Sequence, residues 1–311
     1  MLASVVVSVI LLSLSLLPAQ HVPDNRTLLR LLRSANDSLT SQAPVNRTLP
    51  EVIIFGARKC GTRALLQFLS VHPRIAAAQT EVHFFDRNFD RGFEWYRQQL
   101  PAARADQLTV EKTPSYFVTP DAARRVREMN ASVKLVLIVR EPVTRIVSDY
   151  AQVWAKRLDA RNATLPPLED LILDKFTNSV DLSFKPAWVS VYHHHMTEWL
   201  RYFPLQQIHV VDGDVFAREP AAELAKVERF LQIEAHLSQE KFVFNQTKGF
   251  FCIRTASRGS DQQLSSQLRC LGDAKGRKHP HISSALTKKL RLFYKHHNRL
   301  FFKLINQTFD W

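Results

Sequence analysis

Short, almost wholly apolar runs alternate along this chain with segments in which apolar residues recur every three or four positions. The apolar runs are residues 52–55, 108–110, 134–139 and 208–211. Runs of this length without alternation are typical of parallel strands buried on both faces. The helical patterns between them are residues 64–69, 121–129, 143–156 and 189–203. The alternation predicts an α/β fold, a parallel sheet flanked by helices, with functional residues at the carboxyl ends of the strands.

The first 49 residues follow a different pattern. Residues 2–17 form a run of 16 apolar and serine residues, which is short for a membrane span of about 20 residues. The run suits a signal peptide, although no Lys or Arg precedes it and Leu17 is a poor −3 residue for cleavage near Ala19. We therefore expect a signal peptide or an uncleaved signal anchor over residues 1–20, a polar stem over 21–49, and one domain over 50–311.

Charge and glycosylation motifs narrow the function classes. The formal net charge is +13, from 42 Lys and Arg against 29 Asp and Glu. Such an excess attracts polyanions, whether nucleic acid, anionic lipid or sulfated polysaccharide. Seven N-x-[ST] motifs occur, at Asn25, Asn36, Asn46, Asn130, Asn162, Asn245 and Asn306. They favour a secretory route, so we expect no nucleic acid partner and a polyanion of the secretory lumen.

The segment after the first apolar run has the composition of an anion-binding loop. Gly56 and Gly61 have the spacing of the kinase-type phosphate loop G-x-x-x-x-G-K-[ST]. Here, however, Thr62 follows Gly61 directly, and Lys59 stands two positions before that glycine. Backbone N–H groups at the start of a helix, together with Lys59, form a cradle for phosphate or sulfate. The shifted lysine argues against an ordinary ATPase and favours a different phosphorylated donor; the alternative is a strand, turn and helix with a solvated lysine.

Five separated blocks then occur in a characteristic order. They are Arg-Lys-Cys-Gly-Thr-Arg-Ala-Leu from residue 58, Glu-Val-His-Phe-Phe-Asp from 81, Glu-Lys-Thr-Pro-Ser-Tyr-Phe from 111, Ile-Val-Arg-Glu-Pro from 138 with Ser-Asp-Tyr from 148, and Lys-Gly-Arg-Lys-His-Pro from 275. In these blocks the chain resembles the heparan sulfate glucosamine 3-O-sulfotransferases over residues 50–311. Residues 81–86 and 308–311 resemble isoform 1 most, and isoform 5 is second.

The resemblance implies the sulfotransferase fold and a reaction. The donor would be 3′-phosphoadenosine 5′-phosphosulfate, and the acceptor the glucosamine 3-hydroxyl of heparan sulfate. The family needs no metal, and we expect a monomer in the Golgi lumen that meets a membrane only through an N-terminal anchor. Glu81 would be the general base that removes the hydroxyl proton. Lys59 would stabilise charge on the departing phosphate oxygen, and His83 would hold the acceptor or tune Glu81.

The resemblance also implies two binding sets and a disulfide. The donor set is Arg58, Lys59, Cys60, Gly61, Thr62 and Arg63, then Arg140 and Ser148 for the 3′-phosphate, and Lys275, Gly276, Arg277, Lys278 and His279 in a loop that closes over the donor. The acceptor set is Glu81, Val82, His83, Asp86, Lys112, Thr113, Pro114 and Ser115. The disulfide would join Cys252 and Cys270, around a segment of 17 residues that is longer than expected for isoform 1.

Several residues keep an alternative interpretation. Arg140 could pair with a carboxylate such as Asp149, and Arg145 could be a surface charge. Asp86 is expected to orient Lys112 or the acceptor. Cys60 stands where isoform 1 carries glycine, and we interpret it as tolerated, with a reactive thiol beside Lys59 as the alternative.

Two other function classes stay open beside the sulfotransferase. One is a phosphate-loop kinase, which the absence of a lysine after Gly61 disfavours. The other is a secreted heparin-binding protein without catalysis, which would need charge but not a base. The run His193, His194 and His195 predicts no metal site, because consecutive helical residues point in different directions.

Overall fold

A computed structural model describes residues 45–161, 166–258, 264–272 and 279–311. The chain divides into two compact units, residues 1–46 with 102–106, and residues 47–101 with 107–311. The described part of the first unit centres on a two-stranded sheet, in which β1 (Val45–Arg47) pairs with β4 (Ala102–Arg104). Strand β1 thus falls in the last residues of the predicted stem.

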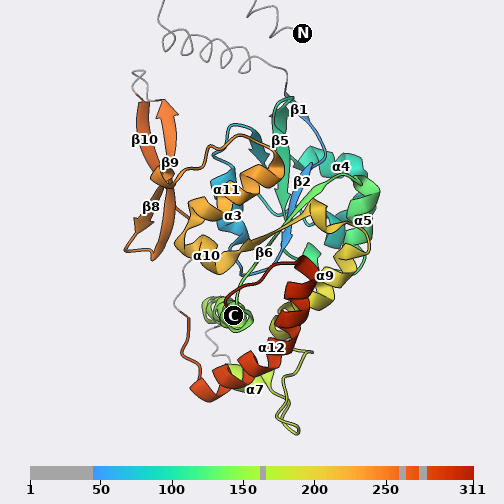
Figure 1. Cartoon of the computed structure of the whole chain (residues 1–311), viewed down its shortest axis with the longest axis vertical. Coiled ribbons are helices and arrows are strands. Elements are labelled where there is room, and N and C mark those ends of the chain that lie inside the picture. Colours follow the sequence, from blue (N-terminus) through green and yellow to red (C-terminus); the bar gives the residue numbers. More distant parts are fainter. Residues whose placement is uncertain (1–44, 162–165, 259–263, 273–278) are drawn as a thin grey trace, which may run out of the picture. The chain divides into compact units, whose positions relative to one another are not determined.

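The second unit is built on a five-stranded parallel sheet with the order β3-β5-β2-β6-β7 (Figure 1). The strands are β2 (Val52–Gly56), β3 (Ile75–Ala77), β5 (Leu108–Lys112), β6 (Lys134–Val139) and β7 (Ile208–Asp212). All four predicted strands are confirmed, and the three-residue edge strand β3 is added. After β2 the chain continues to β3 at one edge of the sheet, and after β6 it continues to β7 at the opposite edge. A crevice is expected where neighbouring strands diverge in this way.

Helices cover both faces of this sheet. Figure 1 shows α3, α10 and α11 on one face and α4, α5 and α9 on the other. The α-helices of the described residues are α3 (Thr62–Leu69), α4 (Gly92–Gln99), α5 (Ala122–Met129), α6 (Pro142–Arg161), α7 (Leu168–Ile172), α8 (Lys185–Val189), α9 (Tyr192–Leu200), α10 (Gly213–Arg218), α11 (Pro220–Leu231) and α12 (Ser284–Ile305). The predicted helix over residues 189–203 is wrong in one respect, because Ser190 and Val191 separate α8 from α9.

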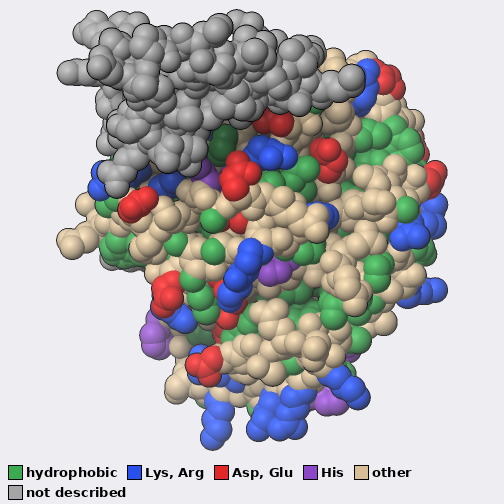
Figure 2. Space-filling view, turned by 45° about the horizontal axis from the view of Figure 1, so that its top comes forward, with side chains coloured by type: hydrophobic (Ala, Val, Ile, Leu, Met, Phe, Trp, Pro, Cys, Tyr) green, Lys and Arg blue, Asp and Glu red, His purple; other side chains and the backbone are tan. Residues whose placement is uncertain are grey.

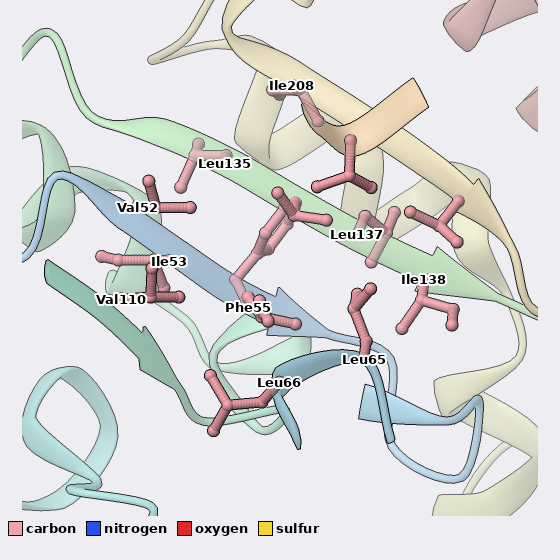
Figure 3. Close-up of a cluster of buried hydrophobic side chains, with 14 of the residues drawn as sticks. Val52, Ile53, Phe55, Leu65, Leu66, Val110, Leu135, Leu137, Ile138 and Ile208 are labelled. Atoms are coloured by element: carbon pink, nitrogen blue, oxygen red, sulfur yellow. The ribbon is translucent and has the colours of Figure 1, made fainter. Parts of the chain in front are cut away.

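The core lies between the sheet and these helices (Figure 3). Leu65, Leu66 and Leu69 of α3 are buried, as their spacing predicts, and each contributes about 1.5–3 kcal/mol by leaving water. On the other face, the ring of Phe55 lies 4.2 Å from that of Trp199, which is 1% exposed. The sheet is therefore held from both sides, and its carboxyl edge becomes a rigid base for the loops that follow the strands.

A three-stranded antiparallel sheet follows in the chain. It consists of β8 (Phe242–Asn245), β9 (Phe250–Arg258) and β10 (Leu264–Arg269), with β9 in the centre. The predicted disulfide between Cys252 and Cys270 is present and ties β9 to the residue after β10. Among the described residues, no helix combines the length and the apolar character needed to cross a lipid bilayer.

Candidate active site

A cleft of about 1360 Å³ opens at the carboxyl edge of the five-stranded sheet. The predicted site residues that line it are Arg58, Lys59, Gly61, Thr62, Arg63, Glu81, His83, Asp86, Pro114, Ser115, Arg140, Ser148 and His279. Val82, Lys112, Thr113 and Cys60 are buried behind the cleft wall. Lys275, Gly276, Arg277 and Lys278 lie outside the described residues. The structure thus gathers five sequence blocks around one cavity.

The loop predicted to bind the donor, residues 57–61, leaves β2 and turns sharply into α3; we call it the donor loop. The backbone N–H of Ala57 donates to the carbonyl of Ile138 on β6 at 2.8 Å. Lys59 and Gly61 both adopt left-handed backbone conformations, with φ of 75° and 107°. That conformation is costly for a lysine, and such strain gathers at functional sites. It places the Lys59 Nζ in the cleft wall, 2.9 Å from Oε1 of Gln152 on α6.

Arg145 supports this loop from inside the protein. The sequence interpretation as a surface charge is wrong, since the side chain is fully buried. Its guanidinium donates to Oγ of Ser190 at 2.6 Å, to the carbonyl of Arg58 at 3.3 Å, and to the carbonyl of Pro186. It also pairs with Asp149 at 3.1 Å. One buried cation therefore joins the donor loop to α6 and α8.

Arg140 follows β6 and enters the cleft from the next strand. Its Nε donates to Oδ1 of Asp214 at 2.8 Å. The alternative that Arg140 pairs with a carboxylate is therefore confirmed, with Asp214 in place of Asp149, which pairs with Arg58 and Arg145. Burial lowers the pKa of His279, and the positive charges of Arg140 and Lys59 lower it further. This part of the cleft therefore favours negative charge in a ligand.

Gly213, at the start of α10, closes the packing beneath the donor loop. A Cβ at this glycine would lie 2.6 Å from the Val139 carbonyl oxygen, 2.7 Å from Cγ of Arg140, and 2.7 Å from the Cys60 carbonyl oxygen. No side chain fits in this space, so the donor loop, β6 and α10 meet backbone to backbone.

Cys60 points away from the cleft into the core. It is 1% exposed, and its Sγ lies 3.6 Å from the hydroxyl of Tyr192. Burial raises the pKa of the Cys60 thiol to about 11. A thiol with that pKa is hardly ionised at neutral pH, and only the thiolate is a good nucleophile. The structure therefore disfavours the alternative of a reactive thiol.

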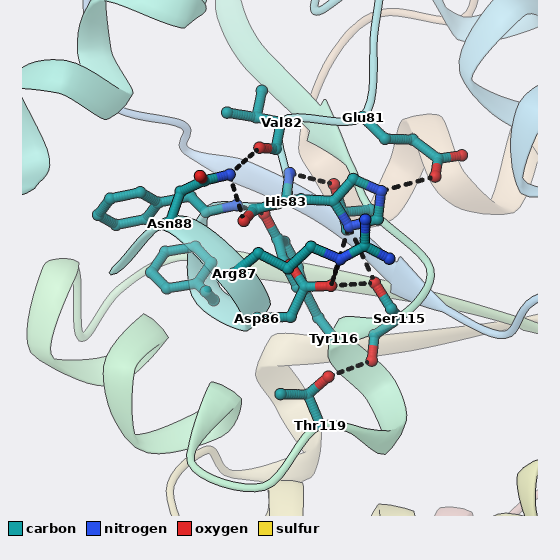
Figure 4. Close-up of polar contacts among 12 residues, drawn as sticks. Glu81, Val82, His83, Asp86, Arg87, Asn88, Ser115, Tyr116 and Thr119 are labelled. Carbon is teal, nitrogen blue, oxygen red and sulfur yellow. Dashed lines mark hydrogen bonds and ion pairs between the residues drawn. The ribbon is translucent and has the colours of Figure 1, made fainter. Parts of the chain in front are cut away.

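The opposite wall carries a chain of polar side chains (Figure 4). Glu81 accepts from the Lys112 ammonium, which is 1% exposed, and lies 3.4 Å from Nε2 of His83. Nδ1 of His83 lies 2.9 Å from Oδ2 of Asp86. Ser115 donates to the same carboxylate oxygen at 2.7 Å. Of the two roles expected for Asp86, the orientation of Lys112 is wrong, because Asp86 contacts His83 and Lys112 contacts Glu81; the orientation of the acceptor stays a prediction.

Three buried side chains hold the backbone of residues 81–84, which we call the acceptor turn after its predicted role. The N–H of Val82 donates to Glu111 at 3.4 Å, that of His83 to Thr113 at 3.3 Å, and that of Phe84 to the Tyr116 hydroxyl at 2.8 Å. These contacts hold His83 in a left-handed conformation with φ of 54°. Three consecutive backbone N–H groups of the turn that presents Glu81 and His83 to the cleft are therefore each held by a hydrogen bond.

Glu111 has no exposed surface, and sequence analysis gave it no role. It also accepts hydrogen bonds from the Thr113 hydroxyl at 2.5 Å and the Tyr96 hydroxyl at 3.3 Å. Burial raises the pKa of the Glu111 carboxyl to about 7, against the lowering effect of its hydrogen bonds and of Lys112. The sequence signal for Glu111 is its position directly after the apolar run 108–110, because a glutamate within a buried strand needs hydrogen-bond or charge partners.

The histidine run serves packing in this structure. Nε2 of His193 lies 2.9 Å from Nδ1 of His297 on α12, and His195 contacts the carbonyl of Trp188. Across the described ranges, no group of three or more His, Cys, Asp or Glu side chains is arranged to hold a metal.

Comparison with known proteins identifies the family. The sulfotransferase domain family matches residues 49–306. Mouse heparan sulfate glucosamine 3-O-sulfotransferase 5 is 39% identical over 300 residues, which cover 95% of this chain and 84% of the relative. Human isoform 6 is 41% identical over 271 residues, or 87% of this chain and 76% of the relative. The chain belongs to the heparan sulfate glucosamine 3-O-sulfotransferase family.

Membership makes the chain an enzyme of the sulfotransferase class and removes the support for a phosphate-loop kinase. A further relative in this family, human isoform 3B1, is 41% identical over 267 residues, or 86% of this chain and 66% of the relative. The fold agrees with a sulfotransferase from Alicyclobacillus acidocaldarius, which matches with a TM-score of 0.61 at 20% identity over 84% of this chain and 98% of that one. The predicted fold and family are thus confirmed. The greater likeness to isoform 1 stays a prediction, since these relatives are isoforms 5, 6 and 3B1.

Proposed function

We propose that this sulfotransferase moves a sulfuryl group from 3′-phosphoadenosine 5′-phosphosulfate to the 3-hydroxyl of glucosamine in heparan sulfate. The observation that carries the proposal is the division of one cleft into two unlike walls. One wall, which we call the donor wall, presents Lys59 and Arg140, which suit phosphate and sulfate. The other presents the Glu81 carboxylate in reach of His83, which suits removal of a hydroxyl proton.

The donor would lie along the first wall. The start of α3 and Lys59 would hold the 5′-phosphosulfate, with Arg58, Gly61, Thr62 and Arg63 around it. Arg140 and Ser148 would hold the 3′-phosphate, and His279 with the loop before it would close over the donor. Cys60 would contribute only its backbone, since its side chain faces the core.

The acceptor hydroxyl would lie beside Glu81. Its oxygen would attack sulfur in line, forming the new S–O bond as the bond from sulfur to the phosphate oxygen breaks. Glu81 would take the hydroxyl proton, and Lys59 would stabilise the negative charge on the departing phosphate. Lys112 and His83 would hold the Glu81 carboxylate, and Asp86 and Ser115 would orient His83. Pro114 would shape the wall of the cleft that faces the acceptor. Val82 and Thr113 would act through the backbone of the acceptor turn.

The remaining parts of the proposal concern the setting of the enzyme. The relatives suit a Golgi or secretory enzyme, with residues 1–20 as signal peptide or anchor, 21–49 as stem and 50–311 as the catalytic domain. We propose a monomer that acts without a metal and binds no nucleic acid. The likeness of residues 81–86 to isoform 1 makes an antithrombin-type heparan site the first acceptor to test, beside unfractionated heparan sulfate.

The test is transfer of labelled sulfate by the purified lumenal domain, followed by mapping of the labelled disaccharide. We expect label at the glucosamine 3-position, and a loss of about 10²- to 10⁴-fold in kcat for Glu81→Gln. Glu128→Gln is the matched control, because Glu128 lies on the exposed face of α5. Binding of 3′-phosphoadenosine 5′-phosphate, measured by calorimetry, should stay unchanged in both variants.

Each other outcome contradicts a defined part of the proposal. Label at another sugar position overturns the choice of the 3-hydroxyl. Full activity of Glu81→Gln overturns its role as base. Tight heparan binding without any label would favour the non-catalytic heparin-binding protein.

A further inference from the structure

Helix α12 carries a continuous row of positive charges on its solvent face. Lys288, Arg291, Lys295, Arg299 and Lys303 are all exposed. Their spacings of three and four residues place them on one side of a helix with 3.6 residues per turn. The row spans about 22 Å at 1.5 Å per residue. We call these five side chains the α12 stripe.

The α12 stripe is poorly neutralised by the protein itself. No Asp or Glu occurs between residues 284 and 305. Arg291 has one distant contact, 3.7 Å to Oε1 of Glu141. The other four stripe residues form no ion pair with a described residue. Like charges at these spacings repel one another by a few tenths of a kcal/mol per pair, so the row of charges lowers the stability of the helix.

The stripe begins close to the active-site cleft. A hollow of about 520 Å³ is lined by His281, Ile282, Ser284, Thr287, Lys288 and Arg291. His279, two residues before this hollow begins, lines the cleft itself. Glu141, the partner of Arg291, directly follows Arg140 of the donor wall. A linear ligand that leaves the cleft on this side therefore meets the first two charges of the stripe.

Figure 2 shows one face of the molecule, on which Lys and Arg side chains gather at the lower end of the view.

Two kinds of polyanion attract such a row, a sulfated polysaccharide and an anionic membrane. Membrane-surface helices insert a broad apolar face into the lipid. The apolar face of α12 is already used, since Leu286, Leu290, Tyr294, Phe301 and Ile305 are buried in the protein. Two exposed leucines, Leu292 and Leu300, are left on α12 beside the charges, which is too little for a broad apolar face. The geometry therefore favours a flexible, linear polyanion that needs charge and no apolar insertion.

From these observations we infer that the α12 stripe is a second binding surface for the sulfated polysaccharide, outside the cleft. The inference rests on the proposed function, because it takes the acceptor chain to be the polyanion. The stripe would bind a part of that chain remote from the reacting glucosamine. Such binding lowers KM for long chains and leaves the chemical step unchanged.

The experiment compares two variants that remove four positive charges each. The stripe variant carries Lys288→Gln, Lys295→Gln, Arg299→Gln and Lys303→Gln. The control carries Arg124→Gln, Arg127→Gln, Arg218→Gln and Arg229→Gln, exposed residues of α5, α10 and α11 that line neither cavity. KM and kcat are measured with long heparan sulfate and with a heparan hexasaccharide. Binding to immobilised heparin is measured at several salt concentrations.

We expect the stripe variant to raise KM for the long chain about tenfold or more. Its kcat, and its KM for the hexasaccharide, should stay within twofold of the wild type. Removing a charge that binds the polysaccharide should reduce the slope of log K against log salt by about one, by analogy with other polyelectrolytes. The control should keep the wild-type slope and KM.

An equal KM for long chains in the stripe and control variants would overturn the inference. So would a stripe variant that loses binding to phosphatidylserine vesicles while its heparin binding stays intact, because the partner would then be a membrane. If the wild type sulfates neither acceptor, the proposed function fails, and the heparin-binding slopes still decide whether the stripe binds sulfated polysaccharide.

Discussion

The two walls of the cleft are built in the same way but supported by charges of opposite sign. Each wall presents a reactive side chain from a turn with a left-handed residue, Lys59 on the donor wall and His83 on the acceptor wall. Behind the donor loop lies the buried cation Arg145, which binds carbonyl oxygens. Behind the acceptor turn lies the buried anion Glu111, which binds N–H and O–H groups.

The two supports differ in how their charges are compensated. Arg145 has a buried carboxylate partner in Asp149, one helical turn away on α6. Glu111 has hydrogen-bond donors, and burial still raises its pKa to about 7. The donor wall is therefore fixed by an ion pair, whereas the support of the acceptor wall changes its protonation near neutral pH. This difference predicts unequal responses to mutation and to pH.

The largest effect is expected from Arg145→Met. The variant removes the buried partner of Asp149, which keeps its ion pair with the exposed Arg58. Breaking a buried pair costs about 3–5 kcal/mol. The melting temperature should fall by on the order of 10 °C for a domain of this size. Differential scanning calorimetry measures it. Adding Asp149→Leu should recover part of the loss, and a fall of only about 1–2 °C in the single variant would show that the pair does not support the donor loop.

A pH-dependent effect is expected from Glu111→Gln. Folding raises the pKa of the Glu111 carboxyl from 4.5 to about 7. Between these two pH values the folded protein therefore keeps a proton that the unfolded chain has lost. The stability from this group is therefore complete below pH 4.5 and is lost as the pH rises through 7. The full shift corresponds to about 3 kcal/mol. The glutamine variant has no such proton to lose.

The measurement is the difference in melting temperature between wild type and Glu111→Gln from pH 4.5 to 8. We expect this difference to shift in favour of the variant as the pH rises. Burial lowers the pKa of His195 and of His209 to about 4. These two histidines therefore make the folded protein more stable as the pH rises from 4 to 6.5, against the effect of Glu111. Because both proteins contain these histidines, their effect cancels in the difference. A difference that stays constant with pH would contradict the raised pKa.

The smallest effect is expected from Cys60→Ala on the donor wall. The thiol packs against Tyr192 and stays protonated, so its loss should cost about 1 kcal/mol and change the rate of sulfate transfer less than threefold. The other two cysteines form the disulfide. Iodoacetamide should therefore leave the native enzyme active. Inactivation that Cys60→Ala escapes would show a reactive thiol.

The strands could be predicted from sequence because parallel strands buried on both faces must be continuously apolar, as residues 134–139 are. Strand β3 was missed, since three residues give no periodicity to detect. Helix α12 was also not predicted, although its buried residues recur at helical spacing from Leu286 to Ile305. The antiparallel strands β9 and β10 were not predicted either, because their pairing depends on contacts between segments and on the Cys252–Cys270 bond.

The candidate site divides in the same way. Cleft-lining residues such as Lys59, Glu81 and Arg140 stood out because their chemical groups and loop positions are visible in the sequence. The supports were hidden, because their roles depend on partners far along the chain. Arg145 contacts Pro186 and Ser190 from other elements, and Glu111 contacts Val82 and Tyr96. The sequence therefore predicts what the site presents to a ligand better than what holds it in place.

The close packing at Gly213 has a consequence for protein engineering. The donor loop is a short motif that invites transplantation between family members or randomisation in a library. It meets, however, a glycine about 150 positions later in the chain, where any Cβ would collide with the Cys60 carbonyl and with Arg140. A loop graft should therefore carry residue 213 with it, and a library that varies residues 57–61 should hold position 213 as glycine.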